Sequence, residues 1–208
     1  MFLFYKVGLK PWKWWGEVRR SDDGGQTWTN RFLLPRGIVG PVKNRPVQMP
    51  DGRLLCGSST EENNRFGWRV HMETCFRGHA WEKSEPLNDG VMVNAIQPTI
   101  LRHADGSYQI LCRNRRGPIL TSRSQDGKDW SPLEPTDLPN ANSGIAAVTL
   151  YDGRHLLVYN ELTYLERRRE RKPLSPLSVA WSLDGVRWMR LLTLEDEPAD
   201  FSYPTILQ

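Results

Sequence analysis

One short unit recurs along the chain and limits what the chain can fold into. An apolar stretch is followed by an Asp-Gly pair and then by a second apolar stretch, with the pairs at Asp51, Asp105 and Asp152. An Asp-Gly pair between apolar runs predicts a β-hairpin, and its preferred two-residue turn, type I′, needs positive φ. The sequence therefore predicts three hairpins, and Tyr203 to Leu207 resembles the first strand of a further one.

A second element follows each hairpin. Its fullest copy runs from Ser21 to Trp28, and shorter or degenerate copies begin at Thr74, Ser124 and Ser182. Its Ser and Asp side chains can accept hydrogen bonds from the N–H groups of a turn, and its Gly takes a φ that other residues resist. A hairpin, a third strand, this turn and a Trp-bearing strand make four strands in roughly 50 residues, the size of one β-propeller blade. We therefore predict an all-β propeller with four-stranded blades.

The repeats divide the chain into expected blades. We place partial blades at residues 1–40 and 199–208, and complete ones at 41–92, 93–140 and 141–198. Both ends resemble cuts through blades, so we expect a segment of a longer protein or an arc completed by another chain. The stretch from Leu162 to Lys172 could form a short charged helix, which Pro173 would end.

The charge balance is mildly basic. The net charge of +4 suits an anionic ligand. We expect no nucleic-acid partner. The basic run 167–172 is interpreted as a solvated loop, with phosphate or nucleic-acid contact as the alternative. No apolar run approaches the ~20 residues of a membrane helix, so no membrane partner is expected, and without a signal peptide the location defaults to the cytoplasm.

Cysteines and histidines give no sign of a metal site. The three cysteines have no regular spacing and end or lie in apolar runs, so we expect buried free thiols. The four histidines are scattered without ligand spacing. We therefore expect neither a metal nor another cofactor.

The Ser-x-Asp-(x)-Gly-x-x-Trp element, in which the residue in parentheses is optional, resembles the Asp box of sialidases and other bacterial-neuraminidase-repeat proteins. The stretches 41–48, 142–144 and 156–160 are also similar to sialidase-like domains. The resemblance implies a six-bladed propeller when complete, of which about three and a half to four blades would be present here. It also implies cleavage of terminal sialic acid or a related acidic sugar, with three arginines on the substrate carboxylate, a tyrosine nucleophile assisted by a glutamate, and an aspartate acid/base.

Two catalytic positions follow from this resemblance. Tyr203 matches the nucleophilic tyrosine, and Gln97 stands where its glutamate partner is expected. Glutamine cannot accept the phenol proton, which puts the usual activation of the tyrosine in doubt. Glu61 is an alternative carboxylate. No Arg-Ile-Pro motif is present, so the first arginine and the acid/base aspartate of a sialidase have no counterpart here.

Substrate-binding positions follow in the same way. Arg113 matches one arginine of the carboxylate-binding set, and Arg45 and Arg69 are further candidates. A guanidinium suits this task because its donors meet both oxygens of a carboxylate. Trp14 and Trp15 can stack on a sugar ring, or pack within the blade instead.

Three functions fit these residues. The leading hypothesis is a sialidase-like glycoside hydrolase domain acting on terminal sialic acid or a related acidic sugar. The second is a non-catalytic carbohydrate-binding propeller, which Gln97 favours. The third is a propeller enzyme with other acidic-glycan chemistry, such as lyase action on uronates.

Overall fold

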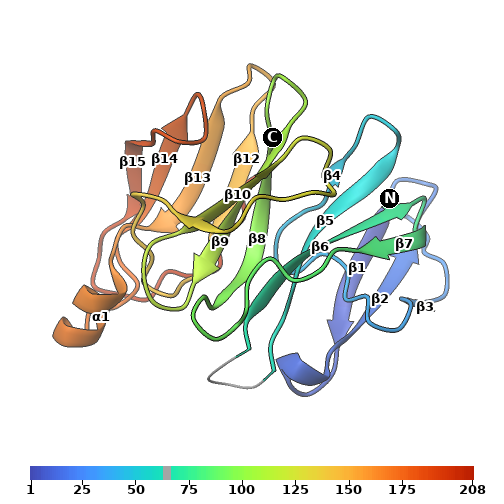
Figure 1. Cartoon of the computed structure of the whole chain (residues 1–208), viewed down its shortest axis with the longest axis horizontal. Coiled ribbons are helices and arrows are strands. Elements are labelled where there is room, and N and C mark those ends of the chain that lie inside the picture. Colours follow the sequence, from blue (N-terminus) through green and yellow to red (C-terminus); the bar gives the residue numbers. More distant parts are fainter. Residues whose placement is uncertain (63–66) are drawn as a thin grey trace.

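Four antiparallel sheets follow one another along the chain in the computed structural model, which describes residues 1–62 and 67–208 (Figure 1). Each sheet is a meander in chain order. Their strands are β1 (Phe2–Val7), β2 (Trp15–Arg20) and β3 (Phe32–Leu33); β4 (Val47–Gln48), β5 (Arg53–Thr60), β6 (Arg69–Phe76) and β7 (His79–Lys83); β8 (Ala95–Arg102), β9 (Tyr108–Asn114), β10 (Leu120–Ser124) and β11 (Glu134–Pro135); and β12 (Ala146–Thr149), β13 (His155–Asn160), β14 (Leu177–Ser182) and β15 (Met189–Glu195). The predicted all-β fold with four-stranded blades is confirmed.

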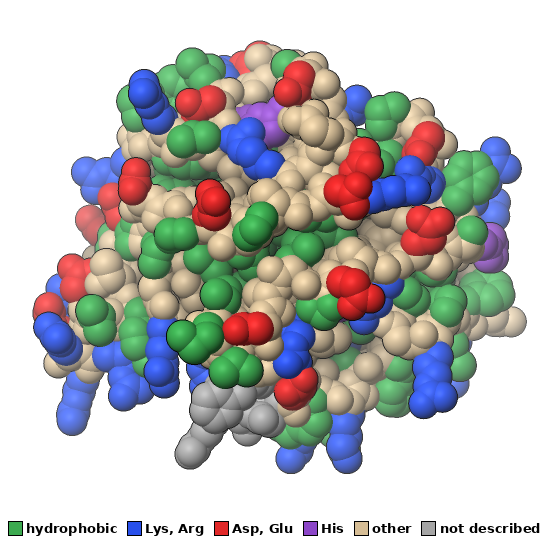
Figure 2. Space-filling view, viewed as in Figure 1, with side chains coloured by type: hydrophobic (Ala, Val, Ile, Leu, Met, Phe, Trp, Pro, Cys, Tyr) green, Lys and Arg blue, Asp and Glu red, His purple; other side chains and the backbone are tan. Residues whose placement is uncertain are grey.

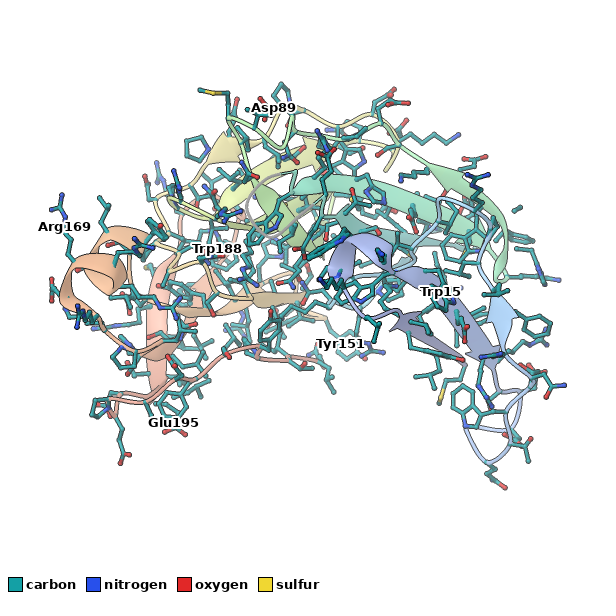
Figure 3. The ribbon with its side chains drawn as sticks, turned by 90° about the horizontal axis from the view of Figure 1, so that it is seen from below. Trp15, Asp89, Tyr151, Arg169, Trp188 and Glu195 are labelled. Atoms are coloured by element: carbon teal, nitrogen blue, oxygen red, sulfur yellow. The ribbon has the colours of Figure 1, made fainter. Side chains whose placement is uncertain are left out.

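The sheets stand side by side as blades in an arch, seen end-on in Figure 3. The first strands β8 and β12 meet, because Thr99 Oγ1 donates to Ala147 O at 3.1 Å and accepts from Ala147 N at 3.0 Å. A cavity of about 670 Å³ runs along residues of β4, β8 and β12 and is also lined by residues 205–208. The expected first strand over 203–207 is not formed, since this segment joins no sheet.

Apolar side chains fill the space between neighbouring sheets. One core joins the second sheet to the third, with Leu55 and Val70 packed against Ile100 and Ile110. A second core joins the third sheet to the fourth in the same way, around Leu111 and Leu157. All three cysteines are buried free thiols, as predicted. The second, third and fourth blades are therefore held face to face by the hydrophobic effect.

The hairpin turns form where predicted, but not as type I′ turns. In the first of them Gly52 N donates to Met49 O at 3.0 Å, and only Gly52 has positive φ. Asp51 keeps negative φ and accepts from Arg53 N through Oδ1 at 3.0 Å. The turns at Asp105 and Asp152 repeat both features. Each is a three-residue loop ending on a left-handed glycine, because the carboxylate captures the N–H two residues on.

The Ser-x-Asp turns share one bonding scheme. In the last of them Ser182 Oγ accepts from Gly185 N at 2.9 Å, and Asp184 Oδ1 accepts from two backbone N–H groups at 2.8 Å. Trp188 Nε1 closes the turn on Gly185 O at 3.2 Å. The indole-to-glycine bond recurs in all four copies, including the degenerate one, where Trp81 donates to Gly78. These turns fasten the outer strands of the blades.

Removing one of these carboxylates should destabilise the fold. The N–H groups of Arg187 and Val186 lower the pKa of Asp184 to about 2, so its charged form is bonded in the native state. We expect Asp184→Ala to lower the free energy of unfolding by about 1–2 kcal/mol in urea titrations at neutral pH. Asp137→Ala is the matched control, because Asp137 is exposed and should cost less than about 0.5 kcal/mol. Equal losses would contradict this assignment.

A histidine pair lies where the third and fourth sheets meet. His155 Nε2 faces His103 Nδ1 at 3.3 Å, and Thr149 Oγ1 and Gln109 Oε1 bond the outer nitrogens of the two rings. Burial, then the charges of His103 and Arg123, lower the pKa of His155 to about 4, and Asp184 opposes them. Burial and Arg123 also lower the pKa of His103, whereas Gln109, Asp105 and Asp184 act to raise it. Both rings are therefore neutral in the folded state at pH 7.

Acid should destabilise the protein through this pair. An unfolded histidine binds a proton below about pH 6.5, whereas folded His155 does so only near pH 4, so stability falls as the pH drops through this window. After allowance for solvent screening we expect His155 to contribute about 1–2 kcal/mol of this loss. Denaturant titrations at pH 7, 6, 5 and 4 should show a flatter profile for His155→Gln than for the wild type. Parallel profiles would contradict this assignment.

The hairpin and Ser-x-Asp turns of the third sheet lie at the opposite end of the blade from Arg113. In the third sheet Ser124 pairs with Tyr108, beside the hairpin turn, whereas Arg113 pairs with Ile96 at the other end of β9. Arg113 lies five positions after Tyr108 along β9, a distance of about 17 Å. The hairpin turn and the Ser-x-Asp turn of this sheet are therefore remote from Arg113.

The described residues also form two short helices, η1 (Pro11–Lys13) and α1 (Tyr164–Glu170). Thr163 and Glu166 form a capping box at the start of α1, and Arg171 ends it in the left-handed conformation. The possible helix within 162–172 is confirmed, and the basic run is therefore helical as far as Glu170 rather than a loop. Neither helix is long and apolar enough to cross a membrane within the described residues.

Candidate functional site

Arg113 joins side chains from three parts of the chain at one end of the arch. Its Nη1 donates to Gln97 Oε1 at 3.2 Å and to Tyr203 Oη at 3.1 Å. Its Nε donates to Asn142 Oδ1 at 2.9 Å. Arg113 lies in β9, Gln97 in β8, Asn142 ahead of β12, and Tyr203 in the C-terminal segment. We call Arg113, Gln97, Tyr203 and Asn142 the Arg113 cluster.

Backbone strain is concentrated in and beside this cluster. Gln97, Asn142 and Tyr203 have φ of 58°, 60° and 57°, and neighbouring Lys43 has φ of 68°. Non-glycine residues rarely adopt this left-handed conformation, and each instance costs on the order of 1–3 kcal/mol. Such outliers persist only where surrounding contacts enforce them, and they gather at ligand sites. The strain therefore points to this end of the arch as the functional one.

Two side-chain amides, buried Asn160 and half-buried Asn44, hold the backbone of the cluster in place. Asn160 Nδ2 donates to Leu174 O at 2.7 Å and to Phe201 O at 2.9 Å, which fixes the segment that leads to Tyr203. Asn44 Nδ2 donates to Gln97 O at 3.1 Å. Tyr203 is itself 57% exposed, so its ring is presented to solvent by an anchored backbone.

Lys43 places a second cation beside Arg113. Its Nζ donates to Ile145 O at 2.7 Å and to Pro204 O at 3.0 Å, so it ties the fourth sheet to the Tyr203 segment. Burial, assisted by the charge of Arg113, lowers the pKa of Lys43 to about 8. Lys43 and Arg113 together make this end of the arch electropositive, which favours an anionic ligand.

Trp68 and Glu61 form the wall of the site on the side of the second sheet. The guanidinium carbons of Arg113 and Arg115 lie 5.3 and 5.2 Å from the Trp68 ring centroid, within cation–π range. Burial raises the pKa of Glu61, against the opposing effects of Arg113, Trp68 and Arg115. Glu61 is therefore a partly buried carboxyl group with a raised pKa next to an arginine pair.

The other predicted binding residues lie apart from the cluster. Arg45 is exposed and lines the cavity along the inner strands. Arg69 forms an ion pair with Glu62. Trp14 Nε1 donates to Gly8 O, and Trp15 Nε1 to Glu17 Oε1, so both indoles bond within residues 8–17. Figure 3 labels Trp15. Of the residues predicted from the sequence, the structure brings Arg113, Gln97 and Tyr203 together, with the alternative carboxylate Glu61 beside Arg113.

Four residues of the site were not predicted from the sequence: Lys43, Asn44, Trp68 and Asn142. Lys43, Asn44 and Asn142 fall inside stretches that resemble sialidase-like domains, but nothing local distinguishes them from loop residues. All four contact residues far away in the sequence, so their roles depend on how the sheets stack.

These features define a propeller arc with Asp-box turns at one end and an arginine-centred cluster at the other. Residues 1–208 match the family model described as the BNR repeat-like domain, and the chain belongs to this family. A curated sialidase from Micromonospora viridifaciens is 27% identical over 154 residues, which is 67% of this chain and 22% of that protein. The predicted place in the sialidase superfamily is confirmed.

Solved structures share the fold at low sequence identity. A protein of unknown function from Dyadobacter fermentans superposes with a TM-score of 0.69 and 19% identity, covering 91% of this chain and 55% of that one. The NanB sialidase of Streptococcus pneumoniae gives 0.65 and 18%, covering 93% and 30%. A leech intramolecular trans-sialidase gives 0.66 and 17%, covering 92% and 31%. The chain thus spans only about half or less of the length of these relatives.

Proposed function

We propose that the Arg113 cluster binds the carboxylate of a terminal sialic acid or a related acidic sugar, and that the chain contributes part of a sialidase-like glycoside hydrolase site. The observation that carries the proposal is the bonding of one guanidinium to both Tyr203 Oη and Gln97 Oε1. A substrate carboxylate would replace neutral oxygens as acceptor of the Arg113 N–H groups, because charge-assisted hydrogen bonds to a carboxylate are stronger than those to neutral oxygens. The nearby charge of Lys43 would add to the attraction.

Tyr203 is the group that would attack the anomeric carbon. Arg113 Nη1 donates to Tyr203 Oη at 3.1 Å, so the guanidinium holds the phenol oxygen at the place where it would hold the substrate carboxylate. A tyrosine oxygen meets less repulsion from the sugar carboxylate than an Asp or Glu nucleophile would, and sialidases are known to use tyrosine. Gln97 orients the same guanidinium but accepts no proton. Glu61, with its raised pKa, is the carboxyl group we assign to proton transfer.

A binding function without turnover is the second candidate. Gln97 favours it, because an amide in place of a carboxylate leaves the tyrosine without its usual base. The same cluster then serves as a lectin-like site for an acidic sugar. Lyase action on uronates is the third possibility, and no contact of the cluster specifically favours it.

Product release separates these candidates. The full-length protein is incubated with a fluorogenic sialoside and with sialyllactose, and free sialic acid is measured alongside binding by calorimetry. We expect binding together with release of free sugar. Binding without release would favour the second candidate, whereas an unsaturated product from a uronate oligosaccharide would favour the third. Absence of binding to any acidic sugar would overturn the proposal.

A further inference from the structure

A basic cleft of about 540 Å³ opens beside the Arg113 cluster, and the function proposed above does not use it. Its charged lining consists of cations: Arg115, Arg116, Arg167, Arg168, Arg171 and Lys172. They come from the loop after β9 and from α1 with the residues that follow it. Figure 2 shows Lys and Arg side chains gathered along the edge of the molecule where α1 lies. No carboxylate is among the described residues of the lining.

The acidic residues of α1 neutralise little of this charge. Glu166 is used by the capping box, where it accepts from Thr163, and Glu170 pairs with Lys172 at 2.7 Å. In the described part of the chain no salt bridge reaches Arg116, Arg168 or Arg171. Cations held close together repel one another, so an anion entering the cleft is favoured by several of them at once.

Two side chains connect the cleft to the Arg113 cluster. Asn142 lines the cleft and accepts from Arg113 Nε at 2.9 Å. Trp68 also contacts both sites, because the guanidinium groups of Arg113 and of the cleft residue Arg115 both lie near its ring. The cleft therefore begins one side chain away from Arg113. A sugar held at Arg113 would therefore have the cleft beside it.

We propose that this cleft binds a second anionic group, a sulfate ester or a second carboxylate, on the sugar next to the terminal acidic one. The preferred ligand is then an acidic oligosaccharide with at least two negative charges on adjacent units. Tyr164 supports this role, since Arg168 lies 5.9 Å from its ring centroid and is thereby held at the cleft. The inference rests on the proposed function, because it takes the first acidic sugar to be at Arg113.

The test compares ligands that differ by one charge. Calorimetry on the full-length protein measures binding of sialyl-α2,3-galactose, of the same disaccharide sulfated on galactose, and of α2,8-linked disialic acid. We expect at least one dianionic ligand to bind about tenfold more tightly than the monoanionic one. A preference for the sulfated ligand alone identifies a sulfate ester, and one for disialic acid alone identifies a second carboxylate. Equal affinity for all three would overturn the inference.

Paired variants assign the preference to the cleft. Arg116→Gln with Arg168→Gln removes one cation from each side of the cleft and should reduce the tenfold preference to about one. Arg169→Gln with Arg187→Gln removes the same charge from exposed residues outside the cleft and should retain it; Figure 3 shows Arg169 at the far edge of α1. Equal loss in both variants would contradict the cleft assignment.

The two proposals fail in different ways. If the monoanionic disaccharide binds and Arg113→Ala abolishes that binding, but the second anion adds nothing, the cleft inference falls and the proposed function stands. If no acidic sugar binds, both fall.

Discussion

Replacing Arg113 with alanine will weaken binding of an acidic sugar by about 100-fold, because two charge-assisted hydrogen bonds to the carboxylate are lost. The truncation also removes the donors to Tyr203 Oη, Gln97 Oε1 and Asn142 Oδ1. Arg113→Lys keeps the charge but not the planar fork, so an intermediate loss is expected. Calorimetry with sialyllactose gives the dissociation constants.

Arg45→Ala is the matched control for Arg113. It removes the same charge from a residue that is exposed and lines the inner cavity. We expect a change in affinity of less than about threefold, since an exposed charge acts only through a screened field. Thermal unfolding of each variant shows whether the fold is intact. Equal losses of affinity in correctly folded Arg113→Ala and Arg45→Ala would place the ligand elsewhere.

Replacing Tyr203 with phenylalanine will lower sialoside turnover by about 10³-fold or more while affinity changes by only a few fold. The variant removes Oη, which accepts from Arg113, and keeps the ring and its anchored backbone. This split is specific for a nucleophile, because a residue that only packs or binds would alter affinity as well. The kcat and KM for a fluorogenic sialoside give the measurement.

Tyr151→Phe is the control for Tyr203, since Tyr151 is 92% exposed on a hairpin turn (Figure 3). It should leave kcat and KM unchanged. If the wild-type protein turns over the sialoside and Tyr203→Phe does so at the same rate, tyrosine is not the nucleophile of this site.

The repeated turns could be predicted from the sequence because their signals are local. Ser182, Asp184 and Trp188 bond within a single seven-residue turn, so the motif contains almost everything that the structure uses. The hairpin type was wrong for an equally local reason. The Asp51 carboxylate captures the N–H of Arg53, which keeps Asp51 at negative φ and leaves positive φ to Gly52 alone.

The site depends on contacts that no local pattern encodes. Tyr203 and Arg113 are 90 residues apart, and Lys43 and Pro204 are 161 apart. Resemblance to sialidases pointed to Tyr203, Gln97 and Arg113 one at a time, whereas Asn142 joins them only because the fourth sheet packs on the third. The basic run of α1 could be recognised in the sequence from its charge. That Arg116 lies across the cleft from it could not, because the two segments meet only in the folded structure.

The most direct test of the account is whether the site recognises a carboxylate. Calorimetry on the full-length protein compares sialic acid and glucuronic acid, each with the methyl ester of its own carboxyl group. If Arg113 binds the carboxylate, at least one acid binds about tenfold or more tightly than its ester, and Arg113→Ala removes this difference in affinity. Equal affinity of each acid and its ester would contradict the account.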